Sequence, residues 1–236
     1  MKVRKSWLFL GVIAIALGLS LLSSPATQAY TVTLDKLLAG ENVTIGDKIF
    51  QNWRNYSSIA SGGALPVNPV NVTLFFTEVT DSLYRIDYQT GSFAVGRNEY
   101  QDTRFTYDVA VVGGIAKIHD NGLELISFGL GDNTKGIINI SETIFDAAGN
   151  TIGTKLVQNN KGVIINPAHF EWDPPVAFIT INKDIALTGL DEVNGGAFIS
   201  DFDQTFSQIP EPTTLILLGS GLLGAALYRR LRKHKG

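Results

Sequence analysis

The stretch Arg104-Phe105-Thr106-Tyr107-Asp108-Val109-Ala110-Val111 alternates large apolar side chains with polar or small ones. Because successive side chains of a β-strand point to opposite faces, this pattern predicts a strand with one face in a core. The same period of two recurs at Val70, Val72, Leu74 and Phe76, at Tyr84, Ile86 and Tyr88, at Ile138, Ile140 and Ile144, and at Phe178–Ile181. The chain is therefore expected to be built mainly from strands.

Turn signals separate these patterns at fairly regular intervals. They lie at 89–91, Gly113-Gly114, 120–122, 131–133, 148–150, 159–162 and 194–196. Helical periodicity is limited to a short turn at Leu34–Leu38, closed by Gly40. Short strands at this spacing favour one all-β domain, an antiparallel β-sandwich or jelly roll, although the pattern does not separate a sandwich from a barrel.

The N-terminus has the layout of a secretory signal peptide. Lys2, Arg4 and Lys5 form a basic region, residues 7–22 are uncharged, and small residues precede a predicted cleavage point after Ala29. The small, turn-prone residues 23–26 favour cleavage by signal peptidase over an uncleaved anchor. We expect a signal helix at residues 1–29 and a mature body that starts at Tyr30.

The C-terminus has the layout of a short membrane anchor. Residues 213–228 carry no charge, and at 1.5 Å per residue such a helix would span about 24 Å, slightly less than a bilayer core. A basic cluster follows it directly and is expected to stay cytoplasmic, which leaves the body on the other side of the membrane. The cluster consists of Arg229, Arg230, Arg232, Lys233 and Lys235.

A Pro-Glu-Pro triplet precedes this helix. Pro210, Glu211 and Pro212, the Gly-containing apolar segment and the basic end occur in the order that is typical of the PEP-CTERM sorting signal, and residues 209–236 resemble it. Further segments resemble a recurring set of cyanobacterial PEP-CTERM proteins, namely Val43–Phe50, Ile181–Ile185 and Ser200–Gln208. The resemblance implies that an exosortase, an integral membrane enzyme, recognises the triplet and cuts near it.

The two prolines fit such a role, because each fixes φ and lacks a backbone donor. We expect Pro210–Pro212 to stay extended and outside any strand or helix, accessible to the enzyme. The alternative is a plain linker before an ordinary anchor. Residues 219–224 also match the G-x-G-x-x-G dinucleotide pattern, but they lie in the apolar segment without a surrounding strand–helix unit, which argues against a nucleotide site.

The body between these signals, residues 30–208, is acidic. With Ile209 included it contains eleven Lys and Arg against twenty-one Asp and Glu, so nucleic acid is not an expected partner. The chain has no Cys, which excludes disulfides and Cys-based chemistry. Stability therefore has to come from the core of the body.

Chemical motifs are sparse in this body. Structural calcium could use Asp120, Asp132, Asp201 and Asp203, although Asp is also common in ordinary turns. Two carboxylates flank a tryptophan at Glu171-Trp172-Asp173, a combination found in sugar-binding and sugar-cleaving sites, but Trp172 before two prolines could equally pack a loop on the core. Trp53 and Tyr56 are further aromatic candidates for sugar binding.

These features favour a non-enzymatic, exported protein that is anchored transiently in the inner membrane and then sorted to the cell surface or extracellular matrix. No catalytic residue, metal ion or cofactor is assigned, and a structural or exopolysaccharide-associated role is expected. The alternatives are a carbohydrate-binding module and a glycan hydrolase that uses Glu171 or Asp173.

Overall fold

The computed structural model describes residues 29–113 and 116–210. The predicted signal helix, most of the sorting signal and the basic cluster therefore lie outside the described residues. Within the described part, no helix is long and apolar enough to cross a membrane.

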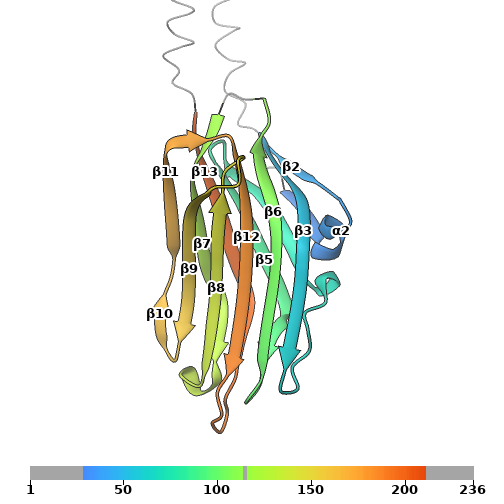
Figure 1. Cartoon of the computed structure of the whole chain (residues 1–236), viewed down its shortest axis with the longest axis vertical. Coiled ribbons are helices and arrows are strands. Elements are labelled where there is room, and N and C mark those ends of the chain that lie inside the picture. Colours follow the sequence, from blue (N-terminus) through green and yellow to red (C-terminus); the bar gives the residue numbers. More distant parts are fainter. Residues whose placement is uncertain (1–28, 114–115, 211–236) are drawn as a thin grey trace, which may run out of the picture.

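Two antiparallel sheets pack face to face in a sandwich, which confirms the predicted fold class (Figure 1). The first sheet has the order β1 (Ala29–Thr33), β4 (Thr73–Thr80), β5 (Leu83–Val95), β13 (Ala197–Pro210), β7 (Ala116–Leu130) and β11 (Ala168–Val176). The second has the order β10 (Val163–Ile165), β9 (Thr151–Asn160), β8 (Gly136–Phe145), β12 (Phe178–Gly189), β6 (Tyr100–Val111), β3 (Lys48–Ser61) and β2 (Val43–Ile45).

Helical structure in the described residues is confined to short segments. The predicted turn at Leu34–Leu38 is confirmed as α2, whose Leu34 and Leu37 are buried. The 3₁₀ segments are η1 (Pro69–Asn71) and η2 (Gly131–Asn133). Val70, predicted to begin a strand, lies in η1, and β4 begins only at Thr73, because Pro69 and the Asn68 side chain favour a turn there.

The strand alternation predicted from sequence defines the core. In β8 every second residue from Gly136 to Ile144 is buried, and in β12 the buried set includes Ile179, Ile181 and Ile185. Aromatic rings fill the centre, where Tyr88 and Phe202 stack with centroids 4.5 Å apart. Burial of these faces is the main stabilising contribution to the fold.

Two of the predicted turns are wrong. Residues 89–91 lie inside β5, where the pairing with β13 shifts and Thr90 accepts a hydrogen bond from the Ser92 amide. Residues 120–122 lie inside β7, where Gly122 leaves room for the side chain of Thr205. Glycine in these strands marks an irregularity and a close approach instead of a chain reversal.

The two proline-containing segments also differ from expectation. Pro210 is the last residue of β13 and lies opposite Ala116, so it does join a strand, at an end where its missing donor costs little. The segment around Trp172 is part of β11 and not a loop. Its prolines fit because β11 is an edge strand that pairs only with β7.

The described chain begins and ends at the same end of the sandwich (Figure 1). Ala29 lies opposite Thr77, and the same row continues across the sheet through Arg85 to Thr205, near the end of β13. Residue 29 and the end of β13 therefore lie at one end of the body.

Candidate functional site

Strand β3 contains two bulges, and these shape a pocket in the described part of the chain. The pairing with β6 shifts by one residue between Gln51 and Arg54 and again between Arg54 and Ser57. Asn52 and Asn55 have φ angles of 54° and 56°, and asparagine tolerates this left-handed conformation better than most residues. A bulge changes the direction in which the neighbouring side chains point. The first bulge, between Gln51 and Arg54, leaves Trp53 buried and Arg54 half exposed.

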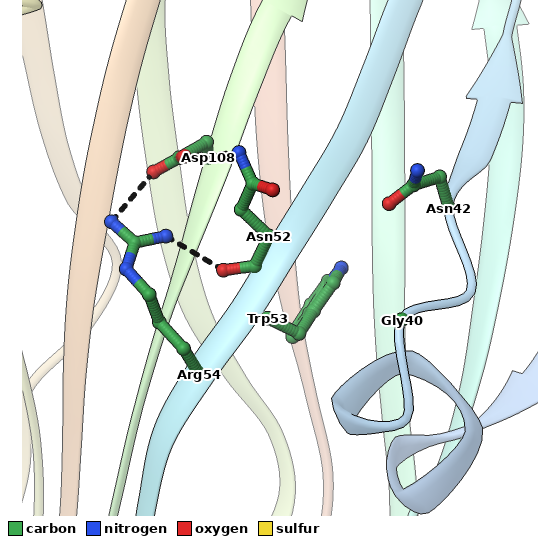
Figure 2. Close-up of a pocket in the computed structure, with 6 residues that line it drawn as sticks. All are labelled: Gly40, Asn42, Asn52, Trp53, Arg54 and Asp108. Atoms are coloured by element: carbon green, nitrogen blue, oxygen red, sulfur yellow. Dashed lines mark hydrogen bonds and ion pairs between the residues drawn. The ribbon is translucent and has the colours of Figure 1, made fainter.

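The pocket has a volume of about 430 Å³ and is lined by Gly40, Asn42, Asn52, Trp53, Arg54 and Asp108 (Figure 2). Gly40 and Asn42 come from the segment between α2 and β2, and Asp108 comes from β6. The pocket thus lies where α2 meets the edge of the second sheet.

The charged residues of the pocket hold one another in place. Asp108 accepts hydrogen bonds from Asn52 Nδ2 at 2.9 Å and from Arg54 Nη2 at 3.0 Å. Arg54 Nη1 also donates to the main-chain oxygen of Asn52 at 2.6 Å. The arrangement is pre-organised, and the Arg54 side chain remains 41% exposed.

Trp53 forms the floor of the pocket. Its ring stacks on Tyr107 at a centroid distance of 4.2 Å, and only 4% of the residue is exposed. The indole nitrogen has no hydrogen-bond partner in the described structure, and Figure 2 shows it at the end of the ring nearer Asn42. Because Tyr107 covers one ring face and the indole nitrogen is itself buried, Trp53 supports the pocket from below and leaves its polar contacts to the other lining residues.

The other predicted sugar-binding residues lie elsewhere. Tyr56, also on β3, donates its hydroxyl to the carbonyl of Val67. Glu171, Trp172 and Asp173 lie on β11, at the opposite side of the sandwich (Figure 1). The structure therefore does not bring the two groups together.

The β11 residues do not form an open aromatic platform. Trp172 is only 6% exposed and packs on Phe170 with ring centroids 5.4 Å apart. Glu171 and Asp173 point to the outer face, where Glu171 Oε1 is 3.3 Å from His169 Nε2.

The predicted calcium ligands are dispersed. Asp120 lies on β7 and accepts hydrogen bonds from Ser207, whereas Asp132 lies in η2 and pairs with Lys135 at 2.8 Å. Asp201 and Asp203 lie on β13. Among the described residues no group of three or more His, Asp or Glu side chains could hold a metal ion.

Sequence reasoning missed a charged network inside the sandwich. Glu142 of β8 is fully buried with Lys155 of β9 and Lys183 of β12, and Gln204 of β13 donates to Glu142 Oε2 at 3.1 Å. Tyr107 in turn donates to Gln204. The available signal was a charged residue at an inward position of an alternating strand, as at Glu142 between Ile140 and Ile144.

Comparison with known proteins locates a family match at the C-terminus. Residues 208–233 match the PEP-CTERM protein-sorting motif. The chain thus carries the sorting signal of an exosortase substrate, which implies export and sorting to the cell surface. The cyanobacterial resemblance stays a prediction, and no curated protein matches the sequence.

Several solved structures show weak similarity. The carbohydrate-binding module TmCBM61 in complex with β-1,4-galactotriose is 14% identical, with a TM-score of 0.28 over 66% of this chain and 89% of that one. A DUF4465 family protein from Bacteroides caccae is 9% identical, with a TM-score of 0.20 over 73% and 99%. A carbohydrate-binding module of type CBM4 is 8% identical, with a TM-score of 0.24 over 80% and 90%. At these scores the similarities carry no argument about function.

Proposed function

We propose that the protein is exported by its signal peptide, held briefly at the inner membrane by residues 213–228 and the basic cluster, and released by an exosortase. The sandwich then has a structural role in the cell surface or extracellular matrix, in association with exopolysaccharide. The observation that carries the proposal is the match of residues 208–233 to the PEP-CTERM sorting motif.

The position of the motif in the fold supports this route. β13 ends at Pro210, which is also the first residue of the Pro-Glu-Pro triplet. The pairing of β1, β4, β5 and β13 places residue 29 at the same end of the sandwich. A body whose two ends leave together can be held at a membrane through both signals while it extends away from the surface.

The test is the intact mass of the protein from its native host, compared with a Pro210→Ala/Pro212→Ala variant. We expect the wild type to begin at Tyr30 and end near Ile209, and the variant to keep its tail and stay with the membrane. Because Pro210 belongs to β13, Pro212→Ala alone is a second variant outside the strand, and Thr213→Ala/Thr214→Ala is a control that preserves the triplet. A wild-type protein that retains Arg229 to the C-terminus would make it a plainly anchored protein.

The pocket beside Trp53 supports a second candidate function, that of a carbohydrate-binding module. It combines the exposed amide of Asn42 with the half-exposed guanidinium of Arg54, which suit a hydroxyl-rich ligand. We expect Arg54→Ala and Asn42→Ala to weaken retention of the body on host exopolysaccharide. Arg97→Ala is the matched control, since Arg97 lies away from the pocket and pairs with Asp191. Equal retention of all variants would exclude this pocket as the binding site.

A further inference from the structure

Three side chains with complementary chemistry meet in the interior, between the two sheets. Lys155 projects from β9 of the second sheet and Asn121 from β7 of the first, and the two residues are 5% and 0% exposed. Lys155 Nζ contacts Asn121 Oδ1 and lies 3.3 Å from the main-chain oxygen of the same residue. Its third partner is Glu142 Oε2, at 2.7 Å. A primary amine, a carboxamide and a carboxylate thus share one site.

The charges at this site do not balance. Glu142 Oε1 contacts Lys183 while its Oε2 contacts Lys155, so two buried amines share one carboxylate. Burial lowers the pKa of Lys155 and lowers that of Lys183 to about 8, against the attraction of Glu142. Burial opposes ionisation of Glu142, but the two lysines outweigh it and lower its pKa. A surplus buried cation is costly, so the site makes the uncharged, nucleophilic form of an amine more accessible than it is in water, although Asp120 and Asp203 act against this shift at Lys155 and Lys183.

We propose that Lys155 and Asn121 become joined by an amide bond through the core, with Glu142 as the proton carrier. The uncharged Nζ attacks Cγ of Asn121, and Glu142 accepts a proton from Nζ as the new C–N bond forms. Glu142 passes this proton to Nδ2, which leaves as ammonia with the electron pair of the broken C–N bond. One ammonia is released, the Lys155 nitrogen keeps one hydrogen, and the carboxylate is regenerated.

The surroundings favour the product. Once Lys155 is an amide, Glu142 and Lys183 remain as a balanced ion pair, which removes the surplus charge from the core. The site is held by its neighbours, since Asn121 Nδ2 donates to the carbonyl of Thr205 at 3.1 Å and Gln204 donates to Glu142. The buried position excludes the water that would hydrolyse the bond.

The placement of the bond also fits an exported protein. The chain has no Cys, so no disulfide stabilises the body outside the cell. An amide between β7 and β9 would close a loop with a sequence separation of 34 residues and would join the two sheets on the side where the edge strands β10 and β11 lie. It would constrain the unfolded chain as a disulfide does, without dependence on redox conditions.

The decisive measurement is the mass of the denatured wild-type protein, followed by peptide mapping. We expect the mass to lie one ammonia, about 17 Da, below that calculated from its sequence. Trypsin should fail to cut after Lys155, and a branched peptide should join the segment around Asn121 to the segment around Lys155.

Variants identify the two partners. Lys155→Met removes the amine together with its surplus charge, so the protein should fold and show its full calculated mass. Asn121→Asp replaces the leaving group, so the deficit should change from one ammonia to one water, about 18 Da. Glu142→Gln should leave the bond unformed. Lys117→Met is the control on an exposed position of β7 and should keep the ammonia deficit.

One other reaction would release the same ammonia. Asn121 precedes Gly122, and an asparagine–glycine pair can close to a succinimide on its own backbone. A deficit that survives in Lys155→Met, without a branched peptide, would assign the loss to the succinimide and overturn the proposal. A wild-type protein with its full calculated mass would overturn it as well, and this result does not depend on the folding of any variant.

Discussion

At the level of single residues, Asp203 shows how the acidic composition acts on stability. It lies in β13 opposite Asp87 of β5 and Glu124 of β7, so three carboxylates form a row across the first sheet. Burial raises the pKa of Asp203 to about 6, Asp87 and Glu124 add to this effect, and Arg85 opposes it. Because the folded-state pKa exceeds that of an unfolded Asp, the folded protein binds more protons between about pH 4 and 6. Stability contributed by this group is therefore lost as the pH rises through that window.

We predict that Asp203→Asn stabilises the body at pH 7. Removal of the repelled charge should raise the free energy of unfolding by about 1 kcal/mol once solvent screening is taken into account, and should flatten the pH dependence between about pH 4 and 6. Urea unfolding at several pH values measures both effects. Asp132→Asn is the control with the opposite sign, because Lys135 lowers the pKa of Asp132 and the carboxylate is favoured in the folded state. A loss of stability in Asp203→Asn at pH 7 would contradict the prediction.

The candidate site shows what residue types alone can and cannot predict. A tryptophan between two carboxylates, together with Trp53 and Tyr56, indicated sugar binding. Burial of Trp53 and Trp172 depends on which way each strand faces, and the bulge at Asn52 decides this for Trp53. The partner of Trp53 in the pocket, Asp108, is distant in sequence and is placed by the pairing of β3 with β6. No local pattern in the sequence carries that information.

At the level of elements, alternation predicted the strands well because one face of each is buried. The turn predictions at 131–133 and 148–150 are confirmed, whereas those at 89–91 and 120–122 are wrong although the residue types are similar. The difference is tertiary, since Gly122 is needed for the approach of Thr205 and Thr90 for a bulge opposite β13. Glycine and asparagine indicate that the backbone needs an unusual φ angle or a close approach at that position. They do not indicate whether the position lies in a turn or in a strand.

The glycines around the β12–β13 connection are needed because backbone atoms approach them closely. A Cβ at Gly189 would overlap the carbonyl of Gly96, and one at Gly136 would overlap that of Gly196. The Gly189 amide also donates to the carbonyl of Glu99 at 2.9 Å. The ends of β8 and β12 thus meet the turn between β5 and β6 and the start of β13 through backbone contacts that leave no room for side chains.

We predict that Gly189→Ala destabilises the fold by about 1–3 kcal/mol, because the added methyl group forces backbone atoms apart. The matched control is Gly91→Ala in β5, where an added Cβ meets nothing within 4 Å. Thermal and urea unfolding should show a lower midpoint for Gly189→Ala and an unchanged or slightly higher one for Gly91→Ala. Equal behaviour of the two variants would show that the connection relaxes freely.

At the level of the whole molecule, the order of strands makes the fold depend on its last element. β13 lies between β5 and β7 in the middle of the first sheet, and it brings Ile199, Phe202 and Phe206 into the core. The residues of β5 that pair with β13 precede their partners by more than a hundred positions in the sequence. Such long-range pairing folds slowly, and the first sheet cannot close until residues 197–210 are available. In our proposed route the chain would therefore cross the membrane unfolded and complete its fold as the sorting motif becomes accessible.

This dependence predicts a sharp difference between two deletions. A body that ends at Gly189 lacks a central strand and should show neither a cooperative unfolding transition nor protection from protease. The reason is that β5 and β7 lose a shared partner and the core loses the buried side chains of Ile199, Phe202 and Phe206, among others. A body that lacks β1 loses only an edge strand, in which Val32 is the buried residue, and should remain cooperative with a lowered midpoint. Near-ultraviolet circular dichroism and limited proteolysis of both, beside residues 29–210, would distinguish them. Native-like protection in the body that ends at Gly189 would contradict this prediction, because the first sheet would then form without β13. Folding during export could then be complete before residues 197–210 have crossed the membrane.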